Sequence, residues 1–166
     1  MTDRVENKDE ETAKQIVVYI DADACPVKDE VYRVAARYGL RTIVVANQPI
    51  AVPRDPMIER VVVGSGPDEA DHWIAARVGK GAIVVTADVP LADRCVKAGA
   101  DVLSPSGRRF TTASIGADLA MRNLLSDLRS AGEVTRGPKP FSTKERSAFL
   151  QSLDRAVTAL KRLGFC

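Results

Sequence analysis

The sequence has no apolar run that approaches the roughly 18 residues that a membrane-spanning helix requires. Residues 1–14 are polar and lack the apolar stretch of a signal peptide. We therefore expect a cytoplasmic protein with no membrane partner. The same acidic segment predicts a disordered N-terminal tail. Residues 15–166 are long enough to form a single domain with a sizeable core.

Cysteine, histidine and aromatic residues are all scarce. The three cysteines, Cys25, Cys95 and Cys166, are far apart and form no CxxC pair, which indicates neither a disulfide framework nor a zinc site. His72 is the only histidine. Aromatic residues make up only 5% of the chain, and no aromatic RNA-recognition pattern is present. Any binding of nucleic acid should therefore depend mainly on phosphate contacts and weaken with salt.

The net charge of +2 hides an uneven distribution along the chain. Residues 1–12 carry five acids and two bases, whereas residues 134–166 carry seven bases and two acids. A basic end of this kind either attracts a phosphate backbone or forms a solvated helix face. The sequence leaves the oligomeric state open, a homo-oligomer included.

Short apolar runs alternate with helical spacing along most of the chain. The runs predict strands at residues 16–20, 42–46, 60–63, 82–86 and 101–103. The spacing predicts helices at residues 27–38, 67–78, 89–98, 111–130 and 143–163, the last with Ser142 as N-cap. This alternation indicates an α/β fold with a mainly parallel sheet and helices on both faces.

Acidic residues follow three of the predicted strands. The carboxyl ends of parallel strands meet at one edge of the sheet, so these side chains should gather in one cleft. Carboxylates with few competing His or Cys ligands suit Mg²⁺ or Mn²⁺, which polarise phosphoryl groups and activate water. The candidate metal ligands are Asp21, Asp23, Asp68, Asp71, Asp88 and Asp93.

Several of these acids also have ordinary structural interpretations. Asp71 is the exception, because it shares a helix face with apolar residues, where a carboxylate is costly unless it is paired, hydrogen-bonded or bound to a metal. Asp68 suits the dipole of the helix start, and Asp88 suits a helix cap. Asp93 also fits a surface acid, and Asp23 a loop residue.

Other polar residues are expected at the same edge of the sheet. Asn47 and Gln48 follow the second strand and would bind substrate or form a turn. Thr86 ends the fourth strand and would bond a carboxylate or water, or serve in a turn. Arg108 and Arg109 follow the fifth strand and precede a helix, which suits phosphate binding.

Four segments carry specific motifs, namely residues 21–26 (DADACP), 46–48 (ANQ), 84–91 (VVTADVPL) and 137–141 (GPKPF). Together they resemble the uncharacterised bacterial YaiI/YqxD family. The resemblance covers roughly residues 16–155, and the family is similar to PIN-like domains of the PIN/5′-nuclease group, which are metal-dependent ribonucleases. It implies a three-layer α/β/α sandwich with Asp21 and Asp88 as metal ligands, a helical acid at Asp68, Glu69 or Asp71, and Asp93 beyond them.

The leading hypothesis is a Mg²⁺- or Mn²⁺-dependent nuclease acting on RNA, with Asp21, Asp71 and Asp88 as catalytic residues. A second hypothesis is a non-catalytic RNA-binding module with the same fold. A third is a haloacid-dehalogenase-type phosphatase, in which Asp21 would be the nucleophile. Such enzymes commonly have Thr where this chain has Cys25, and no catalytic Lys is evident.

Overall fold

The computed structural model describes residues 14–66, 68–132 and 141–166. Residues 1–13 of the predicted tail, the start of the predicted helix at Pro67, and most of the 137–141 segment therefore lie outside the described residues. The strands are β1 (Val17–Asp21), β2 (Arg41–Ala46), β3 (Ile58–Val62), β4 (Ala82–Val85), β5 (Asp101–Leu103) and β6 (Arg109–Phe110). The helices are the 3-10 turn η1 (Ala22–Ala24) and the α-helices α2 (Lys28–Tyr38), α3 (Glu69–Ala75), α4 (Val89–Lys97), α5 (Ile115–Ser130) and α6 (Thr143–Arg162).

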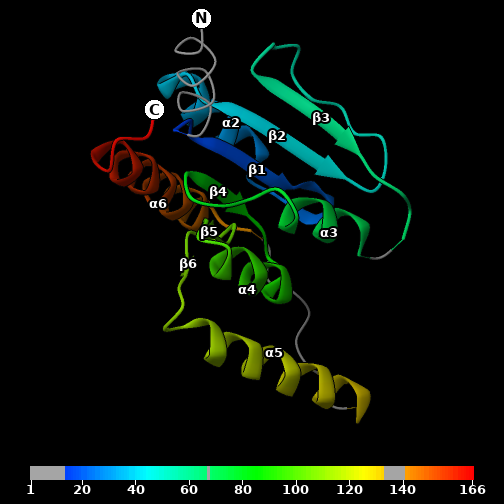
Figure 1. The fold of residues 1–166 in the computed structure, drawn as a ribbon. Coiled ribbons are helices and arrows are strands. Elements are labelled where there is room, and N and C mark those ends of the chain that lie inside the picture. Colours follow the sequence, from blue (N-terminus) through cyan, green and yellow to red (C-terminus); the bar gives the residue numbers. More distant parts are fainter. Residues whose placement is uncertain (1–13, 67, 133–140) are drawn as a thin grey trace, which may run out of the picture.

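The strands form one sheet in the order β3-β2-β1-β4-β5-β6 (Figure 1). The first five are parallel, and β6 runs antiparallel to β5. The five strands expected from the sequence are confirmed within two residues of their predicted bounds. The sequence did not predict β6, because two residues give no apolar run.

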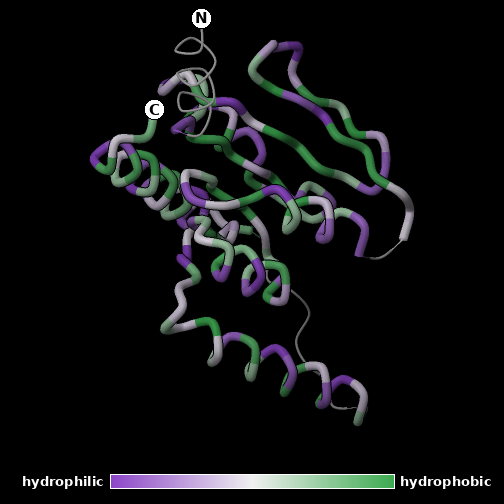
Figure 2. Tube along the Cα trace, viewed as in Figure 1, coloured by the Kyte–Doolittle hydropathy of each residue, from purple (hydrophilic) through white to green (hydrophobic). Residues whose placement is uncertain are grey.

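Helices cover both faces of the sheet, so the three-layer α/β/α sandwich is confirmed. The helices α2 and α6 pack on one face, and α3 and α4 pack on the other (Figure 1). Successive residues of β1 alternate between the two layers: Val18 and Ile20 pack toward α2 and α6, and Tyr19 packs toward α3 and α4. The central strands are therefore apolar along most of their length, whereas α5 alternates between polar and apolar residues (Figure 2).

Two helices are shorter than the sequence predicted, for local reasons. The helix α3 ends at Ala75 because the chain tightens there, with the amide of Arg77 bonded to the carbonyl of Ile74 at 3.0 Å. The helix α5 begins at Ile115 because Thr111 and Ser114 bond each other's backbone amides through their hydroxyls, each at 3.1 Å.

The helix α6 starts as predicted. The hydroxyl of Ser142 accepts a hydrogen bond from the amide of Glu145 at 3.2 Å, which satisfies a free donor of the first turn. Among the described residues, no helix is both long and apolar enough to cross a membrane.

The strand order places a topological switch point between β1 and β4. The chain leaves β1 toward α2 on one face and leaves β4 toward α4 on the opposite face. Where neighbouring parallel strands feed helices on opposite faces, a gap opens beyond their carboxyl ends, and open α/β sheets bind ligands there. Asp21 is the last residue of β1, and Thr86 directly follows β4.

Candidate functional site

A buried hydroxyl joins the ends of β1 and β4. Thr86 is 1% exposed, and its Oγ1 donates to Asp21 Oδ2 at 2.8 Å. The same oxygen accepts a hydrogen bond from the amide of Asp88 at 3.0 Å. Thr86 therefore fixes the Asp21 carboxylate and ties it to the turn that carries Asp88.

Asp88 is the N-cap of α4. Its Oδ1 accepts a hydrogen bond from the amide of Leu91 at 2.9 Å, as the capping interpretation of the sequence requires. The cap uses one carboxylate oxygen and leaves the other with no hydrogen bond to the described residues. Capping also fixes the direction of the side chain, so the structural role does not prevent a second role for the free oxygen.

Asp71 lies half-buried on α3 and experiences the charges of its acidic neighbours. Burial is the main cause that raises its pKa to about 6, and the carboxylates of Asp88, Asp21 and Asp68 raise it further. Arg94 acts in the opposite direction. The structure thus brings together acids from the end of β1, from α3 and from the start of α4.

Asp21 responds to the same neighbours. Burial raises its pKa most, the hydrogen bond from Thr86 lowers it, and Asp23 and Asp88 raise it. In the described parts of the chain, no Lys or Arg nitrogen lies within 4.0 Å of Asp21, Asp71 or Asp88. The repulsion within the cluster is therefore not relieved by a direct ion pair with a described residue.

The acids nevertheless do not close around a single point. Within the described residues, no three His, Cys, Asp or Glu side chains are grouped so that they could hold a metal ion. We call Asp21, Asp71 and Asp88 the acidic edge. Their carboxylates are close enough to raise the pKa of Asp21 and of Asp71, but they are not arranged as the ligands of one metal ion.

Asp23 is held by the end of the neighbouring strand. It lies in η1, and its Oδ1 and Oδ2 both accept the backbone N–H of Asn47, at 3.1 and 3.2 Å. This contact makes Asp23 a clamp between η1 and the end of β2. Asn47 Oδ1 is buried with no hydrogen-bond partner among the described residues, while Gln48 is exposed.

The remaining two acids are less involved with the acidic edge. Asp68 is the N-cap residue of α3, but its side chain makes no capping hydrogen bond. Asp93 is paired with Lys97 one turn further along α4, at 2.9 Å, and its side chain is only 17% exposed, so it is not the surface acid of the alternative interpretation. Glu69, the alternative to Asp68 and Asp71 on α3, is exposed.

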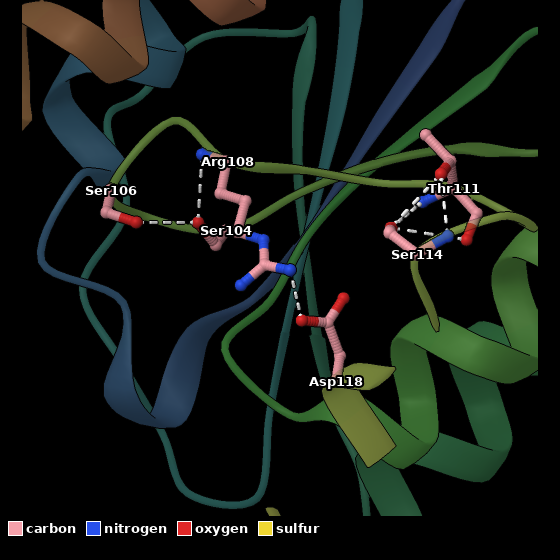
Figure 3. A network of polar contacts seen from close by, with 6 residues as sticks. All are labelled: Ser104, Ser106, Arg108, Thr111, Ser114 and Asp118. Carbon is pink, nitrogen blue, oxygen red and sulfur yellow. Dashed lines mark hydrogen bonds and ion pairs between the residues drawn. The ribbon is translucent and has the colours of Figure 1, made fainter. Parts of the chain in front are cut away.

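The two adjacent arginines point to different parts of the molecule. Arg108 forms an ion pair with Asp118 of α5 (Figure 3). Arg109 lies in β6, donates to Asp101 at 2.6 Å, and lines a pocket together with Arg155 of α6. Only Arg108 of the pair therefore faces the side on which α4 and α5 lie.

Sequence reasoning missed Asp118, the buried partner of Arg108. Its side chain is 7% exposed although it lies in the first turn of α5. An acid in a first turn is normally explained by the helix dipole. Its spacing of three residues from the buried Ile115 was the available signal.

Structural contacts also account for Cys25 and for the single histidine, His72. Cys25 is buried, and burial raises the pKa of its thiol, which disfavours the reactive thiolate. His72 is exposed, and its Nδ1 lies 3.1 Å from a guanidinium nitrogen of Arg94.

Comparison with known proteins agrees with the motifs. Residues 19–159 match the family described as "Uncharacterized BCR, YaiI/YqxD family". A UPF0178 protein of Azorhizobium caulinodans is 65% identical over 150 residues, which cover 90% of this chain and 94% of the relative. A UPF0178 protein of Rhodopseudomonas palustris strain BisB18 is 63% identical over 145 residues, covering 87% of this chain and 94% of the relative. No solved structure gives a significant match. By its motifs, its matched region and these relatives, the chain belongs to the YaiI/YqxD family.

Proposed function

We propose that this protein is a divalent-metal-dependent nuclease that hydrolyses phosphodiester bonds of RNA, with Mg²⁺ or Mn²⁺ as its cofactor. The observation that carries the proposal is the acidic edge itself. Three carboxylates from separate segments converge beyond β1 and β4, and no cationic side chain of the described residues is within 4.0 Å of them. Such an arrangement is unfavourable by itself and becomes favourable when a cation joins it.

The chemistry of the donor set fits a hard cation. All the side chains that converge at the acidic edge offer oxygen, and oxygen is the ligand that Mg²⁺ and Mn²⁺ prefer. Asn47 Oδ1 adds a buried oxygen without a partner among the described residues. Since these side chains are not grouped to hold an ion as they stand, a bound cation would have to draw the acids closer together.

The proposed roles follow from the contacts. Asp21, Asp71 and Asp88 would hold the cation, and Asp23 and Asp68 would support it from the rim. Such a cation polarises phosphoryl oxygens and activates water. Thr86 orients Asp21 through its hydrogen bond, and the hydrogen bond from the backbone amide of Leu91 orients Asp88. Arg108, Asn47 and Gln48 would contact the substrate, whereas Arg109 lines a pocket with Arg155 of α6 instead. Asp93 is already paired with Lys97.

The test is cleavage of a labelled single-stranded RNA in the presence of Mg²⁺, of Mn²⁺ and of EDTA. The wild type should cleave only with metal, and Asp21→Asn and Asp88→Asn should abolish cleavage while the fold is retained. Glu59→Gln is a matched control, because Glu59 is an exposed acid of the edge strand β3 that pairs with Arg41. Full metal-dependent activity of either Asp variant would show that the assignment is wrong.

The same assay separates the two alternatives. RNA binding that weakens with salt, without cleavage under either metal, would favour the non-catalytic module. A phosphoaspartate trapped at Asp21 would favour the phosphatase. The structure gives an argument against the phosphatase, because both oxygens of Asp23 are engaged by the amide of Asn47.

A further inference from the structure

A groove of about 460 Å³ lies between α5 and the turn that joins β5 to β6. It is lined by three arginines and three serines, namely Arg108, Arg122, Arg129, Ser104, Ser106 and Ser126. Among the described residues that line it, Asp118 is the only acid. We call this hollow the arginine groove. Its polar lining consists mainly of hydrogen-bond donors, and such a lining favours an anion with many acceptor oxygens.

The positive charge of the groove is only partly neutralised. Arg108 is neutralised by its ion pair with Asp118. For Arg122 and Arg129, no carboxylate of the described residues lies within 4.0 Å. Arg122 has only a long contact of 3.5 Å with the side chain of Asn123 in this part of the structure. Two arginine side chains are therefore available to phosphate oxygens.

The turn that forms one wall is rigidly placed. The amide of Arg108 donates to Ser104 Oγ at 3.1 Å, and Ser104 Oγ lies 2.8 Å from Ser106 Oγ (Figure 3). Gly107 has φ +90°, and the hydroxyl of Ser152 in α6 donates to its carbonyl at 2.6 Å. The turn is thus fixed against α6, so Arg108 is held in position before any ligand arrives.

The groove also has an apolar side. Val89 and Phe110 line its base, and Met121 and Leu125 of α5 line its outer wall with exposures of 56% and 39%. Exposed apolar side chains beside arginines can pack against nucleobases while the arginines hold the phosphates. Val89 directly follows Asp88, so the groove begins next to the acidic edge.

We infer that the arginine groove binds a segment of single-stranded RNA next to the scissile phosphodiester, with the phosphates on Arg108, Arg122 and Arg129 and the bases against Met121 and Leu125. The identity of the ligand as RNA rests on the proposed function. One further feature fits a nucleotide. Asp118 Oδ2 is buried in the lining without a partner among the described residues, and it can accept a hydrogen bond from a ribose hydroxyl or a base amino group.

The test is equilibrium binding of a fluorescein-labelled oligouridylate to the full chain in EDTA, measured by fluorescence anisotropy over a range of salt concentrations. The double variant R122A/R129A should bind on the order of tenfold more weakly and lower the slope of log K against log salt by about 1.4, that is, about 0.7 for each phosphate that the protein no longer neutralises. Both side chains are exposed on α5, so the fold should survive, and circular dichroism checks this.

The matched control is R33A/R162A. It removes the same charge from exposed residues of α2 and α6, on the opposite face of the sheet, and it should leave the affinity nearly unchanged. An equal loss of affinity in both double variants would overturn the inference, since bulk charge would then explain binding. Undiminished binding by R122A/R129A, or no binding by the wild type, would overturn it as well.

Binding in EDTA is independent of cleavage, so the two proposals fail separately. A wild type that binds through the groove but never cleaves would support the groove and overturn the nuclease. If the wild type cleaves with metal while R122A/R129A binds normally, the nuclease would be supported and the groove overturned.

Discussion

Replacing Asp71 with Asn should stabilise the metal-free protein at neutral pH. The pKa of Asp71 is raised from 3.8 to about 6 in the folded protein, mainly by burial. The folded state therefore holds a proton in a pH range where the unfolded chain has already released it. Ionisation of Asp71 consequently opposes folding, fully above about pH 6 and not at all below its unfolded pKa of 3.8.

The size of the effect follows from the shift and from the exposure of the side chain. A shift of about two units corresponds to a ceiling of about 3 kcal/mol. Asp71 is only half-buried, so solvent screens much of the repulsion, and about 1 kcal/mol is the realistic gain. For a domain of this size, that gain raises Tm by about 2–4 °C.

The assay is thermal unfolding in EDTA, followed by circular dichroism at neutral pH and at about pH 4, where the penalty is mostly absent. Asp29→Asn, an exposed acid of α2 outside the acidic edge, is the control and should change little. The reasoning is refuted if Asp71→Asn gains no stability at neutral pH, or gains the same amount at both pH values. Added Mn²⁺ should stabilise the wild type more than the variant, because the variant has lost a proposed ligand.

Three further outcomes follow from the same contacts. Thr86→Val should cost about 1–2 kcal/mol in urea unfolding and reduce cleavage, because it leaves Asp21 half-buried without its hydrogen bond, and Thr86→Ser should restore both. Gly107→Ala should destabilise the protein by more than about 1 kcal/mol, because the added Cβ would lie 2.7 Å from a carbonyl oxygen of α6. Gly39→Ala, where φ is also positive but nothing lies within 4 Å, should cost less, and equal losses would contradict the clash. Cys25 should react slowly with a thiol reagent in the native state at neutral pH, since burial raises its pKa, and rapid labelling would contradict its buried placement.

The parallel sheet could be predicted because its cause is local. The runs that became β1, β2 and β4 are apolar at nearly every position, as strands covered on both faces must be. The convergence of Asp21 with Asp71 and Asp88 then followed from one topological rule about strand ends.

The features that the sequence did not reveal depend on tertiary contacts between polar groups. Asp23 bonds an amide 24 residues away, and Arg108 meets Asp118 across a turn. Neither pairing changes the hydrophobic pattern of the sequence, so neither could be predicted from periodicity. The separation of Arg108 from Arg109 has the same origin, because it depends on the two-residue strand β6.

The acidic edge and the arginine groove should contribute differently to turnover, because they adjoin at Asp88 and Val89 but carry opposite charge. In the proposed nuclease the acids repel a polyanion until a cation is bound, and the groove would supply the attraction that brings RNA to the site. R122A/R129A should therefore raise KM with little change in kcat, since the contacts that these two arginines make are the same in the bound substrate and in the transition state. Asp88→Asn should instead abolish turnover even at saturating RNA. Steady-state kinetics at two salt concentrations measures both effects, and a loss of kcat alone in R122A/R129A would place those arginines at the reacting phosphate instead.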